Sequence, residues 1–178
     1  MTKKLAALDR YRDHMVGGAL ADLERPGASV DQIGAYLDGL VQAVAAGGPA
    51  RFGCLMANTM SDLAVSFPRD GEAVSAETGP ATGGSDEEHT AEEVSGRVLA
   101  HLDRLVAAFQ TALTTARERG EVRPGLDAAV HAHQLAVTVQ GISTCARLGR
   151  TDVLQHSVEA TMSALTADAP SQSPPQTI

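Results

Sequence analysis

Apolar residues recur through most of this chain at the three- and four-residue spacing of an amphipathic α-helix. The spacing predicts helices over residues 5–24, 29–44, 53–66, 90–119, 128–148 and 152–166. Glycine and proline stand between these segments, as in Pro26-Gly27 and Gly47-Gly48-Pro49, and no alternating strand pattern is present. The pattern therefore predicts an all-α fold, an antiparallel bundle of about six helices.

Several helix ends carry recognisable signals. Ser29 followed by Gln32 predicts a capping box, Asp127 and Thr151 are expected to cap the last two helices, and Gly120 is placed as a C-terminal glycine.

Residues 68–90 differ in composition from the rest of the chain. They are rich in Gly, Pro, Ser, Thr and acids and almost lack large apolar side chains, so they cannot offset the entropy of ordering. We expect a flexible insertion there, within a single regulatory domain over 1–167, and a disordered tail over 168–178.

Helix 128–148 is apolar or small nearly all the way round, which implies burial on two sides. One face can pack on helix 90–119, but the other, with a stripe of helix 152–166, has no internal cover. A two-fold homodimer joined through these last two helices would bury both of these apolar faces. The alternative is a monomer in which 128–148 is the central core helix. The candidate interface residues are Ala132, Ala136, Gly141, Ser143, Val153, Val158 and Met162.

Charge and composition exclude several classes of function. The net charge of −8 argues against non-specific DNA binding, which needs a basic surface. No apolar run is long enough to span a bilayer, no signal peptide follows Lys3 and Lys4, and Cys54 and Cys145 are expected to be buried thiols. We expect a cytoplasmic protein without membrane contact.

No residue pattern points to catalysis. His131 and His133 are two positions apart and so face different sides of a helix, which prevents them from chelating one metal. The sequence has no Cys-x-x-Cys pair, phosphate-binding glycine loop or nucleophile elbow. We expect no enzyme activity, no cofactor and no metal.

A pocket for a small hydrophobic effector is consistent with the apolar helices. Mostly apolar walls with a few hydrogen-bonding groups suit such a ligand, although ordinary core packing is the alternative for each residue. The amides of Asn58 and Gln140 are the strongest candidates, because a buried amide needs a partner that a ligand can supply. The full candidate set is Cys54, Asn58, Thr59, Leu102, Phe109, Gln140 and Thr144.

Three segments, taken together, resemble the TetR family of transcriptional regulators in its AcrR-type group. They are residues 51–59 (Arg-Phe-Gly-Cys-Leu-Met-Ala-Asn-Thr), 120–127 (Gly-Glu-Val-Arg-Pro-Gly-Leu-Asp) and 139–142 (Val-Gln-Gly-Ile). They are similar to parts of the C-terminal effector-binding and dimerisation domain. The resemblance implies a helical triangle around a pocket, two final dimer-forming helices, and a repressor whose effector shifts the spacing of its DNA-reading modules.

Residues 3–11 look like the family's exit from its helix-turn-helix, so the expected DNA-binding module is missing before them. A truncation, a misplaced start and a natural absence are all open. As given, the chain is expected to bind its effector and to homodimerise without contacting DNA directly. The alternative is a dimerisation or protein-interaction module with no small-molecule ligand.

Overall fold

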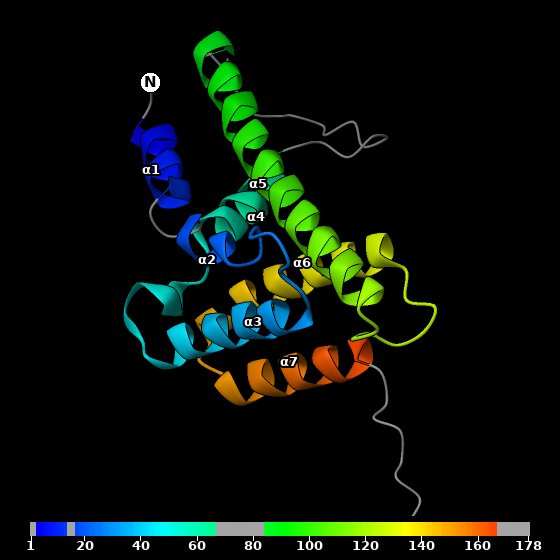
Figure 1. Cartoon of the computed structure of the whole chain (residues 1–178). Coiled ribbons are helices and arrows are strands. Elements are labelled where there is room, and N and C mark those ends of the chain that lie inside the picture. Colours follow the sequence, from blue (N-terminus) through cyan, green and yellow to red (C-terminus); the bar gives the residue numbers. More distant parts are fainter. Residues whose placement is uncertain (1–2, 14–16, 67–83, 167–178) are drawn as a thin grey trace, which may run out of the picture.

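The computed structural model describes residues 3–13, 17–66 and 84–166 (Figure 1). Within these residues the elements are helical, apart from an isolated bridge between Val122 and Thr166. The predicted all-α fold is confirmed. In chain order the helices are α1 (Lys3–Tyr11), α2 (Gly17–Ala21), α3 (Val30–Ala45), the 3₁₀ helix η2 (Gly48–Phe52), α4 (Leu55–Ser66), α5 (Gly84–Glu118), α6 (Ala128–Cys145), the 3₁₀ helix η3 (Ala146–Leu148) and α7 (Thr151–Leu165).

The long helix α5 connects two groups of shorter helices (Figure 1). Helices α1 and α4 pack against it and against each other, on the side of its N-terminal half. Helices α3, α6 and α7 gather at the other end, where α3 lies between α6 and α7 and contacts both. The protein is thus a bundle that widens around the C-terminal half of α5.

Most of the predicted helix-end signals are present. The side-chain oxygen of Gln32 accepts a hydrogen bond from the Ser29 backbone N–H at 2.8 Å. The Asp127 carboxylate accepts from the N–H groups of Ala129 and Val130 at 2.9 and 3.1 Å. The expectation for Thr151 is wrong, because α7 begins at this residue and Arg150 occupies the cap position without a side-chain bond.

Two helix boundaries differ from the predicted ones. The helix expected over 5–24 is divided into α1 and α2, and the second begins with Gly17 and Gly18, which are poor helix formers. Helix α5 begins at Gly84 rather than near 90. The acidic residues at 86–88 suit the positive end of a helix dipole, which favours the earlier start. The rest of the predicted insertion and the predicted tail lie outside the described residues.

The core has two parts. The main cluster surrounds Phe109, whose ring meets the Tyr36 ring edge to face with centroids 5.7 Å apart. A smaller cluster between α1, α4 and α5 contains Leu5, Leu8, Met56, Val94 and Val98. Tyr11 packs against both clusters. This tyrosine therefore joins the N-terminal helix to the body of the protein.

Arginines on α5 hold the N-terminal segment in place. Arg97 Nε donates to the Asp9 carboxylate on α1 at 3.1 Å. Arg104 binds both carboxylate oxygens of Glu24, after α2, at 2.6 and 2.7 Å, and this pairing lowers the pKa of Glu24. Asp9 on α1 and Glu24 after α2 are thus both fixed to α5.

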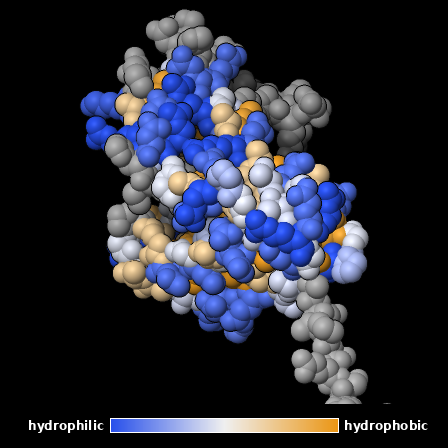
Figure 2. Space-filling view, in the orientation of Figure 1, coloured by the Kyte–Doolittle hydropathy of each residue, from blue (hydrophilic) through white to orange (hydrophobic). Residues whose placement is uncertain are grey.

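The surface is largely polar on the face shown in Figure 2, with smaller hydrophobic areas among hydrophilic residues. Among the described helices, none has the length and apolar content needed to cross a membrane.

Candidate ligand pocket

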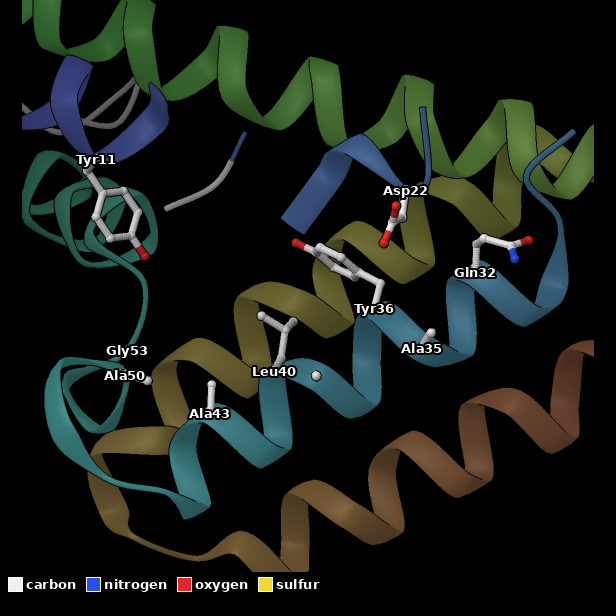
Figure 3. Close-up of a pocket in the computed structure, with 10 residues that line it drawn as sticks. Tyr11, Asp22, Gln32, Ala35, Tyr36, Leu40, Ala43, Ala50 and Gly53 are labelled. Carbon is white, nitrogen blue, oxygen red and sulfur yellow. The ribbon is translucent and has the colours of Figure 1, made fainter. Parts of the chain in front are cut away.

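A cavity of about 380 Å³ lies between α3 and the N-terminal part of the chain (Figure 3). Its lining comes from α1, the residue after α2, one face of α3, and the region of η2 and the turn that follows it. The lining residues are Tyr11, Asp22, Gln32, Ala35, Tyr36, Gly39, Leu40, Ala43, Ala50 and Gly53.

Helix α3 has two different faces. Ile33, Leu37 and Val41 are buried in the main core. The stripe that faces the cavity repeats at three- and four-residue spacing but carries small side chains at Ala35, Gly39 and Ala43. A Cβ added at Gly39 would meet nothing within 4 Å, so the space beside it is free. These small residues leave the cavity unfilled.

The two tyrosines of the chain both line the cavity. Burial is the main cause that raises the pKa of each phenol, and the neighbouring Cys54 raises both further. The Tyr11 hydroxyl is also hydrogen-bonded to the Cys54 side chain and to the backbone of Leu55, the first residue of α4. The phenols therefore remain neutral hydrogen-bonding groups in a mostly apolar cavity.

Asp22 supplies a charge at the cavity. Its side chain is exposed and pairs with Arg25 at 3.2 Å. Figure 3 shows its carboxylate directed toward α3, in the region of Tyr36. Gln32 also lines the cavity, but its side-chain oxygen is engaged in capping α3.

The turn between η2 and α4 lies directly on α6. Gly53 has a φ of 77°, and a Cβ there would collide with the carbonyl oxygen of Ser143. Asn58 Nδ2 donates to the Phe52 carbonyl at 2.9 Å, and Arg147 donates to Asn58 Oδ1. These contacts fix the wall of the cavity that Ala50 and Gly53 form.

None of the seven ligand residues suggested by the sequence is among the ten that line this cavity. Cys54 does not line the cavity, but it interacts with both of the tyrosines that do. Thr59 and Phe109 are buried, Leu102 packs on the main cluster, and Thr144 is exposed and donates to the Gln140 carbonyl. Asn58 has protein partners at both ends of its amide. Gln140 Oε1 is buried without a partner among the described residues.

The sequence did not lead to Tyr11, Tyr36 or the other residues of α3 that face the cavity. Two signals were present. Tyrosine is scarce in this chain, and α3 carries Ala, Gly, Tyr and Leu opposite its core stripe instead of charged residues. A helix face that carries apolar and aromatic side chains without charges can line a pocket for a small molecule.

The predicted interface residues differ in their exposure. Ala132, Ala136, Ser143 and Val158 are buried within the protomer, so the expectation that they face a partner needs correction. Their positions belong to the stripes of α6 and α7 that pack on the protomer's own helices. Met162 is partly buried against the main cluster, whereas Gly141 and Val153 are exposed.

His101 is a buried polar residue that does not line the cavity. It is 4% exposed, its Nδ1 has no hydrogen-bond partner among the described residues, and burial lowers its pKa. Within the same residues no three His, Cys, Asp or Glu side chains form a group able to hold a metal ion.

Two of three comparisons with known proteins found a similar protein or family. Residues 81–162 match the family model described as "Tetracyclin repressor-like, C-terminal domain". A solved TetR transcriptional regulator from Chloroflexus aurantiacus J-10-FL has a similar fold, with a TM-score of 0.62 and 23% identity over 92% of this chain and 73% of that chain. A search of curated protein sequences found no match.

The solved structure supports the all-α fold, and the family match over residues 81–162 supports a domain of a transcriptional regulator. Residues 81–162 match a TetR-family C-terminal domain, the family that the sequence motifs had indicated. The TetR family is one of transcriptional regulators.

Two glycine substitutions test the close contact at the cavity wall. Gly53 and Gly47 have nearly the same backbone conformation, with φ of 77° and 79°, but a Cβ at Gly47 meets nothing within 4 Å. Gly47→Ala should lower the free energy of unfolding by about 1–3 kcal/mol through backbone strain alone. Gly53→Ala should lower it further, because Ser143 must move. Urea denaturation measures both, and an equal or smaller loss for Gly53→Ala would contradict the contact.

Proposed function

We propose that this domain binds a small, mostly apolar effector in the cavity and forms a homodimer through α6 and α7, as part of a transcriptional regulator. The observation that carries the ligand proposal is a cavity of about 380 Å³ in a TetR-family C-terminal domain, lined largely by Ala, Gly, Leu and Tyr. Pockets for small molecules have volumes of roughly 300–1,000 Å³ and a few polar groups in apolar walls.

Tyr11 connects the cavity to other parts of the protein. Its ring lines the cavity and contacts both core clusters, and its hydroxyl reaches the start of α4. A ligand that contacts Tyr11 would therefore favour one position of α1 relative to α4 and α5. Residues 3–11 resemble the family's connection to its DNA-binding module, so this bias would change DNA binding by the regulator.

The dimer proposal depends on an exposed apolar stripe. Val130, Val137 and Leu148 are 61, 69 and 74% exposed, and Gly141 and Thr144 are exposed between them at three- and four-residue spacing. On α7 the exposed residues at the same spacing are Val153, Ser157, Ala160 and Ala164. A second copy would cover both stripes, and the small residues would let the helices cross closely.

A module that only dimerises is the alternative. One observation favours it, because the Asn58 amide that was expected to meet a ligand already has protein partners. The small side chains along α3 weigh against it, since they leave the cavity open where a pure packing surface would be filled.

Filling the cavity should abolish ligand binding. Gly39→Phe places a ring in the free space beside α3 and replaces a poor helix former, so the fold should be retained. The neutral fluorescent probe N-phenyl-1-naphthylamine should bind to the unmodified protein and on the order of tenfold or more weakly to Gly39→Phe. Fluorescence titration measures the difference.

Gly96→Phe is the matched control for this experiment. Gly96 is exposed on α5, away from the cavity lining, and its Cβ position is also free within 4 Å. The control should bind the probe like the unmodified protein. Equal binding by the Gly39 and Gly96 variants would show that the probe does not occupy this cavity.

A charge in the exposed stripe of α6 should separate the dimer. No atom lies within 4 Å of a Cβ added at Gly141, so Gly141→Glu leaves the protomer undisturbed. In a two-fold interface it would bring two buried carboxylates together, which is costly without partners. Sedimentation equilibrium should show dimers for the unmodified protein and for Gly96→Glu, but monomers for Gly141→Glu. An unchanged dimer mass for Gly141→Glu would rule out this surface.

A further inference from the structure

We propose that the effector is an amphipathic organic cation, with an ammonium-like end near Asp22 and an apolar body along α3. This inference deepens the proposed function and depends on it. It concerns the charge of the ligand, which the family match leaves open.

The charges of the lining support a cation. Asp22 is the one ionisable carboxylate among the ten lining residues, and those residues include no Lys, Arg or His. Tyr11 and Tyr36 stay neutral because burial raises the pKa of both phenols. An anionic ligand would therefore meet a carboxylate and no basic side chain in the lining itself, whereas a cation would meet its counter-charge.

The arrangement of the lining also suits a cation with an apolar tail. Figure 3 shows the Asp22 carboxylate directed toward α3 in the region of the Tyr36 ring. Carboxylates and tyrosine rings both attract ammonium groups, the ring through its π-electrons. The exposed carboxylate would keep the charged end near water. Leu40, Ala43 and Ala50, farther along the cavity, would cover the apolar body.

Arg25 is the protein cation that competes for Asp22. The two side chains are 64 and 69% exposed, and a solvent-exposed pair of this kind contributes roughly 0–1 kcal/mol. A ligand ammonium can share the carboxylate or replace Arg25 at little cost. Arg104 is already bound to Glu24, and Arg12 to Asp9 and Asp13, so these guanidiniums have other partners. The net charge of −8 adds a long-range attraction for cations.

Three amphiphiles with the same chain test the charge preference. Octyltrimethylammonium, 1-octanol and octyl sulfate, each below its aggregation concentration, are titrated against the full chain by calorimetry at low salt. The ammonium compound should bind about tenfold or more tightly than the sulfate, because only it is attracted by Asp22. Its affinity should fall as salt is added, while that of octanol should not.

Asp22→Asn removes the charge and keeps the shape of the side chain. It should weaken octyltrimethylammonium binding about fivefold and leave octanol binding unchanged. Asp38→Asn is the matched control, since Asp38 is an exposed carboxylate on α3 that does not line the cavity. This control should bind all three compounds like the unmodified protein.

The possible results separate the two proposals. If octyl sulfate binds as tightly as the ammonium compound, or if Asp22→Asn changes ammonium binding no more than Asp38→Asn does, the cation preference is wrong. Octanol binding that is lost in Gly39→Phe would still support the ligand pocket in that case. If none of the three compounds binds, both the pocket and the cation preference are contradicted.

Discussion

The cavity depends on a packing constraint, which is the small size of three of the side chains on the cavity-facing side of α3. Ala35, Gly39 and Ala43 cannot fill the space between this helix and α1. Tyr36 is large enough, but its edge-to-face contact with Phe109 ties its ring to the main core. In a chain with three phenylalanines and no tryptophan, few other side chains can take its place. The unfilled volume is thus a consequence of composition and helix register together.

The elements around this space are held independently of any ligand. Arg97 and Arg104 fix α1 and the segment after α2 to α5 through Asp9 and Glu24. On the opposite side, Gly53 allows the turn before α4 to rest on α6. Both walls of the cavity are thus anchored by contacts within the protein. Tyr11 is the one residue of α1 among the ten that line the cavity.

Hydrophobic spacing predicted most of the helices, although it missed the division into α1 and α2 and the early start of α5. The motif at 120–127 lies within the segment that matches the family model. The location of the cavity did not follow, because periodicity reveals which residues share a helix face but not which helix that face meets. Ala132 and Ala136 were expected at an interface for this reason, yet they pack on the protomer's own core. Phe109 was expected to contact the ligand, but it supports Tyr36, which lines the cavity instead. Choosing between the two faces of a helix requires its tertiary neighbours.

The two tyrosines allow a direct test of ligand location, since both line the cavity. Protein labelled with 3-fluorotyrosine should give two fluorine NMR signals, one from Tyr11 and one from Tyr36. Addition of N-phenyl-1-naphthylamine should shift or broaden both signals at concentrations where its fluorescence reports binding. If the probe binds while both signals remain unchanged, the ligand lies elsewhere in the protein, and the assignment of this cavity as the effector site is wrong.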